Sequence, residues 1–270
     1  MIGAILGDII GAPYEDCPCK DKNFPLFGIG KNRITDDSLM TMAVFCALEK
    51  CNGNYKNLEQ IAAQEMVKWG NKYPSDYGIN FAGWLKRSTE IIQPPYNSFG
   101  NGSAMRVSPV AYFAKSLIEC MELAQAVTRM THNHREGIIG AEATAVATWL
   151  ALQGKSQEEI RKHIDTEYYP MNRTCADIIA SGYRFDASCQ GTVPESIQAF
   201  LEATSFEDAI RKTVMLGGDA DTMGAITGAI AGAFFKISQN LIDKIFDYSI
   251  DDNIEAVIRR MIKKGIIKND

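Results

Sequence analysis

The sequence predicts an all-α protein folded as one domain. Apolar side chains recur at helical spacing along most of the 270 residues, whereas runs of alternating β-branched residues are nearly absent. The composition, 46% hydrophobic and 23% charged, is that of an ordinary globular protein. The length allows one large domain or two small ones, but no long linker or low-complexity segment divides the chain. We therefore expect a single domain over residues 1–270, with helices packed around one buried centre.

The first strongly periodic segment, residues 38–51, has a broad apolar surface that includes Leu39, Met42 and Phe45. Loops rich in Gly, Pro and Asn separate it from the segments that follow. Further helices are expected over residues 58–69, 81–85, 104–113, 118–130, 137–152 and 157–163. The least regular part of the chain, residues 169–190, is expected to be a loop-rich insertion over one face of the core.

The last third of the chain carries clearer helix-start signals. A helix over residues 195–203 is expected to begin after Pro194, because proline is frequent at the first helical position. Ser205 is expected to cap the next helix, with Asp208 three residues further on. Two helices, over residues 241–248 and 254–262, close the chain. Four basic residues near its end are expected to form a solvated face, namely Arg259, Arg260, Lys263 and Lys264.

Small residues mark one face of the segment 223–235. Gly224, Gly228 and Gly232 recur every four residues and therefore share one helix face. Each glycine in a helix interior costs about 1 kcal/mol relative to alanine, so this bare face indicates the close approach of a neighbouring helix. A membrane-embedded GxxxG contact is the alternative. The polar context and the short apolar stretch favour a buried central helix instead.

Charge and cysteine content limit where the protein is expected to occur and what it is expected to bind. The formal net charge of −5 gives no general attraction to nucleic acid or to anionic membranes. The seven cysteines are odd in number and lack a paired CxxC motif, which is typical of free thiols in the cytoplasm. The apolar N-terminus has no basic flank and is interrupted by Asp8, unlike a signal peptide. We expect a cytoplasmic protein with no membrane partner and no nucleic-acid ligand.

Two acidic clusters each precede an apolar helical segment. Taken singly, each is explained by helix capping. Together they supply oxygen donors without clustered Cys or His, which favours Mg²⁺, Mn²⁺ or Ca²⁺ over zinc. If the two loops meet, their carboxylates repel one another unless cations lie between them, and two ions about 3.5–4 Å apart are the usual solution. The six candidate metal ligands are Thr35, Asp36, Asp37, Asp219, Asp221 and Thr222.

A glycine-rich stretch, residues 98–106, opens another helical segment. It lacks the lysine of a P-loop, but backbone N–H groups at a helix N-terminus can seat an anion, and Arg106 can add a bidentate contact. A tight turn into a core helix is the alternative. For His132 and His134, a solvent-facing or capping role competes with hydrogen bonding to a ligand. Glu15 is a surface residue unless the apolar N-terminal segment is central.

Five stretches of the chain, in this order, resemble the ADP-ribosylglycohydrolases, the family that includes the dinitrogenase-reductase-activating glycohydrolase. They reach to about residue 232 and are specific in combination. The stretches are Gly7-Asp8 with Gly11-Ala12-Pro13-Tyr14-Glu15, Thr35-Asp36-Asp37-Ser38, Gly100-Asn101-Gly102-Ser103-Ala104-Met105-Arg106, Thr131-His132-Asn133-His134 and Gly218-Asp219-Ala220-Asp221-Thr222. Many bacterial relatives have Pro in place of Arg135 and Ser in place of Ala220. We expect these two departures to alter the rim of the site and hence the preferred leaving group.

The resemblance implies a compact orthogonal helix bundle with two divalent cations, Mg²⁺ or Mn²⁺, held in a central cleft by the six candidate ligands. It implies that Asp36 and Asp221 contact both ions or the ligand, and that Glu15 is an acid/base or gating residue. These three are the candidate catalytic residues. Phe99 would stack on adenine. The full ligand-binding set, which would cradle the diphosphate and the distal ribose, is Phe99, Gly100, Asn101, Gly102, Ser103, Met105, Arg106 and His132.

The implied activity is hydrolysis of the bond between ADP-ribose and an acceptor, most simply the arginine side chain of a mono-ADP-ribosylated protein. The cations would hold the ribose hydroxyls while water attacks the anomeric carbon, and a carboxylate would move the proton. The alternatives are a small conjugate such as O-acetyl-ADP-ribose, ADP-ribosylated nucleic acid, and non-catalytic binding of ADP-ribose. Retention of every implied metal residue argues against the non-catalytic alternative. The chain has no obvious partner-docking module, and we expect a monomer.

Overall fold

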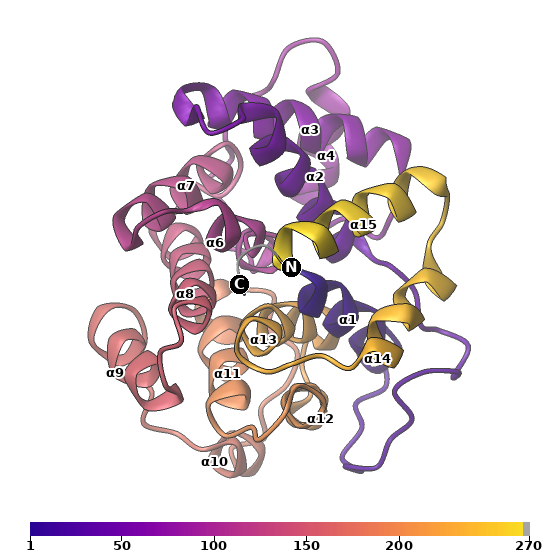
Figure 1. The fold of residues 1–270 in the computed structure, drawn as a ribbon, viewed down its shortest axis with the longest axis vertical. Helices are drawn as coiled ribbons and strands as arrows, with labels where there is room; N and C mark the ends of the chain where they lie inside the picture. Colours follow the sequence, from indigo (N-terminus) through magenta and orange to yellow (C-terminus); the bar gives the residue numbers. More distant parts are fainter. Residues whose placement is uncertain (267–270) are drawn as a thin grey trace.

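A glycine-lined pair of antiparallel helices, α1 (Ile2–Gly11) and α13 (Ala220–Phe234), forms the centre of the protein in the computed structural model, which describes residues 1–266 (Figure 1). A Cβ atom on Gly7 would overlap the Gly224 carbonyl oxygen, and one on Gly3 would overlap that of Gly228. Only glycine therefore allows this approach. The predicted burial of the small-residue helix is confirmed, whereas α1 was not expected as a helix.

The remaining helices surround this pair, and residues 1–266 contain no strand, only an isolated β-bridge. Four longer helices pack on the central pair: α2 (Asp36–Cys51), α8 (Arg135–Leu152), α11 (Cys189–Leu201) and α12 (Phe206–Leu216). The remaining helices are α3 (Leu58–Lys72), α4 (Ile79–Arg87), α5 (Gly102–Met105), α6 (Pro109–Phe113), α7 (Leu117–Arg129), α9 (Gln157–Glu167), α10 (Cys175–Ala180), α14 (Gln239–Lys244) and α15 (Asp252–Ile266). Short 3₁₀ turns are η1 (Ala12–Tyr14), η2 (Tyr55–Asn57) and η3 (Ile245–Tyr248). The predicted all-α, single-domain fold is confirmed.

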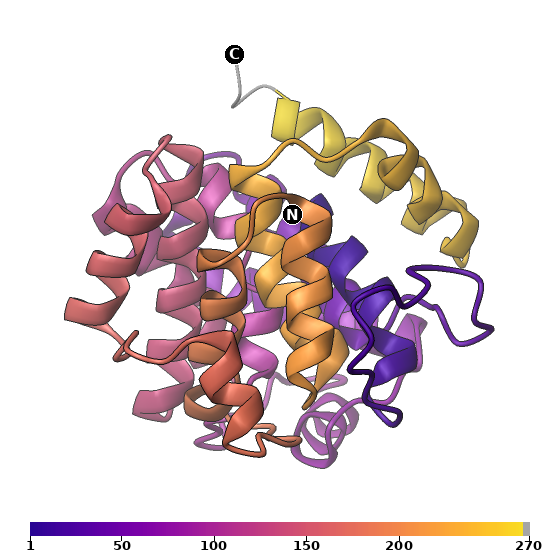
Figure 2. The ribbon, with the colours of Figure 1, turned by 90° about the horizontal axis from the view of Figure 1, so that it is seen from below.

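The C-terminal helices form a layer over one side of the molecule. In Figure 2, α14 and α15 (yellow) lie above α1 (indigo). α15 buries Ile254, Ile258 and Met261, while Arg259 on its exposed side pairs with Glu255. The predicted solvated basic face is consistent with this arrangement. No helix within residues 1–266 combines the length and the apolarity needed to cross a bilayer.

Three expected element boundaries were wrong. The helix expected over residues 104–113 is broken into α5 and α6, because the ring of Pro109 would clash with the carbonyl of Met105 in a continuous helix. Pro194 does not start its helix but lies inside α11, whose apolar face already begins with the buried Cys189 and Val193. The region expected to be loop-rich contains α10, which Thr174 caps.

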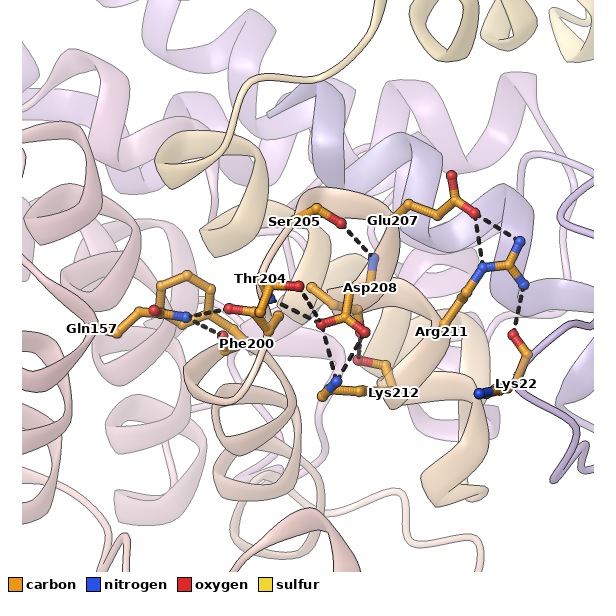
Figure 3. A network of polar contacts seen from close by, with 12 residues as sticks. Lys22, Gln157, Phe200, Thr204, Ser205, Glu207, Asp208, Arg211 and Lys212 are labelled. Atoms are coloured by element: carbon orange, nitrogen blue, oxygen red, sulfur yellow. Dashed lines mark hydrogen bonds and ion pairs between the residues drawn. The ribbon is translucent and has the colours of Figure 1, made fainter.

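The N-terminus of α12 follows the capping prediction closely (Figure 3). The Ser205 hydroxyl accepts a hydrogen bond from the Asp208 backbone N–H at 3.1 Å. The return bond is displaced by one residue, because the Asp208 carboxylate accepts from the backbone N–H of Thr204 at 2.9 Å. Lys212, one turn later, donates to the same carboxylate at 2.8 Å. This cap fixes the start of the helix that leads into the second acidic loop.

Candidate active site

A cavity of about 370 Å³ opens where the N-terminal ends of α2, α5 and α13 meet the end of η1. The α3–α4 loop and the loop before α11 complete its wall. Six carboxylates line it, against one guanidinium. The polar side chains in its wall are those of Glu15, Asp36, Asp37, Asp76, Asn80, Tyr96, Ser98, Asn101, Arg106, His132, Asp219, Asp221 and Thr222.

The two acidic loops meet at the floor of this cavity, as the sequence predicts. Carboxylate oxygens of Asp8, Asp37 and Asp221 lie within 4.8 Å of one another, and so do those of Glu15, Asp219 and Asp221. Asp221 belongs to both groups, each of which could hold a metal ion. Asp36, on the first turn of α2, lines the same cavity.

Asp8 completes the first group and was not among the predicted ligands. It is fully buried on α1, and its Oδ1 accepts from the Thr35 hydroxyl at 2.7 Å. Its Oδ2 accepts from the Ser38 hydroxyl and from the backbone N–H groups of Thr35 and Ser38 at 3.1 and 3.2 Å. The central helix thus positions the start of α2. The signal in the sequence was a single carboxylate inside an otherwise apolar segment.

Thr35 and Asp37 divide their roles at the start of α2. The Thr35 hydroxyl accepts from the Asp37 backbone N–H at 3.2 Å and caps the helix. Thr35 does not line the cavity, because it bonds to Asp8 behind the wall. Asp37 lines the cavity and its Oδ1 atom is buried without a hydrogen-bond partner. A buried carboxylate oxygen without a hydrogen-bond donor needs another partner, and a metal cation can be that partner.

Burial and mutual repulsion raise the pKa values of these carboxyls. For each of four aspartates, burial is the largest cause and the charge of Asp221 is the second. The pKa of Asp8 and of Asp36 rises to about 7, and the pKa of Asp37 and of Asp219 rises well above its usual range. The same two causes raise the pKa of Glu15 to about 7. Full ionisation of these carboxyls is therefore unfavourable, and bound protons or cations would relieve it.

This electrostatic arrangement predicts an unusual pH dependence of stability. The raised pKa values mean that the folded protein holds more protons than the unfolded chain, so the metal-free protein loses stability as pH rises through the folded values. We expect its free energy of unfolding, measured by urea titration, to fall from about pH 4, where these carboxyls ionise in the unfolded chain, to about pH 8, above their folded pKa of about 7. Millimolar Mg²⁺ should remove this fall, because cations replace the protons.

The variant Asp221→Asn provides the control for this pH effect. It removes the charge that all four raised aspartates share, and should flatten the slope. A metal-free wild-type protein whose stability stays constant or increases over that pH range would contradict the arrangement. The buried His132 and the buried N-terminal amine of Met1 act in the opposite sense, because folding lowers their pKa values, but the five carboxyls with raised pKa values outweigh them.

The second acidic loop is shaped by two glycines. Gly217 and Gly218 have φ values of 84° and 87°, a left-handed conformation that favours glycine. They turn the chain from α12 so that Asp219 forms the N-cap of α13 and Asp221 its first turn. Asn101 Nδ2 donates to Asp219 Oδ2 at 2.7 Å. The glycine-rich loop and the acidic loop are thereby joined directly.

The glycine-rich loop is held from behind by the segment before α11. The Asn101 N–H donates to the Ala187 carbonyl at 2.8 Å, and the Cys189 N–H donates to the Phe99 carbonyl at 2.9 Å. Gly100, Asn101, Gly102 and Met105 line the cavity. Ser103 does not, since it is fully buried and donates its hydroxyl to the Gly137 carbonyl at 2.8 Å. Ser103 therefore supports the loop from the rear.

Arg106 brings a buried positive charge to the cavity. It is 1% exposed, and it lies over the Phe81 ring at 5.3 Å. Its Nη2 donates to the Thr131 hydroxyl at 2.7 Å, while its Nε has no partner. Burial lowers its pKa to about 10, which still leaves it charged at neutral pH. Within residues 1–266 no carboxylate forms an ion pair with it, so an anionic ligand would complete its environment.

The two histidines of the 131–134 stretch differ. His132 is 4% exposed, lines the cavity and contacts the Thr131 hydroxyl at 2.8 Å through Nδ1. Burial, and then the charge of Arg106, lower its pKa well below the usual value, so it is neutral. The solvent-facing alternative was wrong for this residue. His134 takes the capping role, since its Nδ1 accepts from the Glu136 backbone N–H at 3.1 Å.

Three expectations about the wall of the cavity need correction. Phe99 does not line it; this ring is 48% exposed and packs edge-to-face on His134 at 5.4 Å. Arg135 and Ala220 do not line it either, because the former is exposed at the start of α8 and the latter is buried against α1. The aromatic residues that do line it were missed, namely Phe81, Tyr96 and Phe185. They come from irregular segments and a short helix, where no periodic signal marks them.

Comparison with known proteins gives consistent results. The family model described as ADP-ribosylglycohydrolase matches residues 1–266. An ADP-ribosyl-[dinitrogen reductase] glycohydrolase of Rhodospirillum rubrum is 26% identical, over 97% of this chain and 92% of the relative. The ADP-ribosylarginine hydrolase Tri1 of Pseudomonas putida is 26% identical, over 88% of this chain and 70% of the relative. A solved structure titled as an ADP-ribosylglycohydrolase-related protein complex shares the fold, with a TM-score of 0.72, 22% identity, and coverage of 98% of this chain and 97% of that one.

Proposed function

The chain belongs to the ADP-ribosylglycohydrolase family, and we propose from this premise that it releases ADP-ribose from arginine side chains of proteins with the help of two divalent cations. The observation that carries the proposal is one cavity with a carboxylate floor centred on Asp221 and a buried, unpaired Arg106 in its wall. A cation-binding floor suits ribose hydroxyls, and a guanidinium suits a diphosphate. The arginine acceptor is supported by the name of the Pseudomonas putida relative.

The donor set fits divalent cations of the magnesium type. All donors at the floor are oxygens, which favours Mg²⁺ or Mn²⁺ over softer metals. The unpartnered Asp37 Oδ1 and the raised pKa values of the surrounding carboxyls both indicate a place where positive charge is missing. We assign the cations to Asp36, Asp37, Asp219, Asp221 and Thr222. Asp8 lies close to Asp37 and Asp221, but both of its oxygens accept hydrogen bonds from Thr35 and Ser38, so we assign it to support of this group. Thr35 would contribute by orienting Asp8. When bound, the cations would fix the vicinal hydroxyls of the ribose and lower the pKa of a water.

The remaining residues then bind the substrate and move a proton. Arg106 and the backbone of Gly100 and Gly102 would hold the diphosphate, with His132 behind the two glycines. Glu15, whose pKa is raised to about 7, can carry a proton at neutral pH. We assign it to protonation of the leaving nitrogen as the bond to the anomeric carbon breaks. Adenine would lie on the lining aromatic rings, with Phe185 better placed than Phe99.

Direct assay of two substrates tests the proposal. We expect the purified protein to release ADP-ribose from ADP-ribosyl-arginine with Mg²⁺ or Mn²⁺, and to lose this activity in EDTA. O-acetyl-ADP-ribose serves as the second substrate, because it differs only in the leaving group. Exclusive turnover of O-acetyl-ADP-ribose would reject arginine as the acceptor. Full activity of either substrate in excess chelator would reject the role of the cations.

The role of Glu15 gives a separate prediction. Glu15→Gln should lower kcat for ADP-ribosyl-arginine by about 10²–10⁴-fold, the usual contribution of a general acid. Mg²⁺ should still raise the melting temperature of the variant, because the other carboxylates remain. Asp16→Asn is the matched control, since Asp16 is the exposed neighbour and does not line the cavity. Equal loss in the two variants would contradict the assignment.

A further inference from the structure

The mouth of the cavity carries a carboxylate that the metal-binding set does not include. Asp76, in the loop between α3 and α4, lines the cavity although its side chain is 89% exposed. Arg33, in the segment before α2, donates from Nη2 to Asp76 Oδ2 at 3.2 Å. A guanidinium group of the chain itself therefore already rests on Asp76.

The Arg33–Asp76 pair lies on the leaving-group side of the cavity. The charges of both residues act on the carboxyl of Glu15, which is the group assigned to protonate the leaving nitrogen. Glu15 and Asp76 line the same cavity, so an acceptor that Glu15 protonates leaves from a space that Asp76 also lines. Arg33 is 46% exposed, and such an exposed pair contributes little to stability. Another guanidinium can replace Arg33 without disturbing the core.

We propose that Asp76 selects a guanidinium leaving group, and that Arg33 occupies Asp76 until the arginine of the substrate replaces it. This inference rests on the proposed release of ADP-ribose from arginine. A carboxylate matches the planar fork of a guanidinium, whereas the acetyl group of O-acetyl-ADP-ribose offers no charge to it. Asp76 and Arg33 thus act on the acceptor and not on the ADP-ribose part, which the two substrates share.

The two substrates and three variants separate these effects. Asp76→Asn should raise KM for ADP-ribosyl-arginine about two- to fivefold relative to KM for O-acetyl-ADP-ribose, as expected for an exposed ion pair. Arg33→Gln removes the competing guanidinium and should lower KM for ADP-ribosyl-arginine by a similar factor. Added salt should raise this KM in the wild type and have less effect in Asp76→Asn. Glu90→Gln, at an exposed carboxylate outside the cavity, is the control and should change neither KM.

An unchanged ratio of the two KM values in Asp76→Asn overturns the role of Asp76, even if the wild type cleaves ADP-ribosyl-arginine. If the wild type cleaves only O-acetyl-ADP-ribose, the proposed release of ADP-ribose from arginine is wrong. Binding of a guanidinium at Asp76 is then tested with arginine amide as an inhibitor. Inhibition of the O-acetyl-ADP-ribose reaction by arginine amide, lost in Asp76→Asn, would still support a guanidinium site. Absence of inhibition would overturn it.

Discussion

Replacing Asp221 by asparagine should abolish both activity and cation binding. Asp221 is the residue common to the two carboxylate groups at the cavity floor, so its loss would remove a ligand from both of the proposed cation positions at once. Replacing a residue that only orients a metal ligand lowers metal affinity or activity about 10–100-fold. Loss of a ligand itself should have a larger effect than that. Release of ADP-ribose and isothermal titration with Mg²⁺ measure the two effects.

The fold should survive this substitution. Asparagine keeps the size of the side chain and removes a charge that repels its neighbours, so the metal-free variant should be at least as stable as the metal-free wild type. Asp243→Asn, at an exposed carboxylate on α14, is the control. An Asp221→Asn protein that hydrolyses ADP-ribosyl-arginine normally, or is stabilised by Mg²⁺ as the wild type is, would refute the dinuclear arrangement.

The acidic floor was predictable because its residues stand at helix starts. Thr35 to Asp37 and Asp219 to Asp221 each combine a capping pattern with more carboxylates than a cap uses. That excess is visible in the sequence. Their convergence follows from α13 being central, which the spacing of its glycines indicates.

Residues whose role depends on another element were not predictable in the same way. Asp8 could be recognised only after α1 was known to pack against α13 and α2. Ser103 belongs to a motif stretch but faces Gly137 and not the cavity. Asp76 and Phe185 sit in loops, where their positions are determined by tertiary contacts and no local period marks them.

The glycine contact between α1 and α13 is the second place where a single substitution should have a large effect, here on stability. We expect Gly7→Ala to lower the free energy of unfolding by about 3 kcal/mol or more, at or above the usual range for an overpacked core. The new methyl group would overlap the Gly224 carbonyl oxygen and its carbon atom, which are backbone and cannot move aside as a flexible side chain does. Urea denaturation of the metal-free protein measures this change.

Gly265→Ala is the matched control, because the nearest atom to its Cβ would be a Tyr112 ring carbon at 4.0 Å. In the last turn of α15 the added methyl should change the free energy of unfolding by less than about 1 kcal/mol. Gly7 adjoins Asp8, and Gly224 lies on the helix whose first turn holds Asp221. Forcing the helices apart should therefore also weaken Mg²⁺ binding in Gly7→Ala under conditions where the variant is still folded. A Gly7→Ala protein of wild-type stability would show that α1 and α13 do not touch along their backbones, and the helix contact that brings Asp8 beside Asp221 would be refuted.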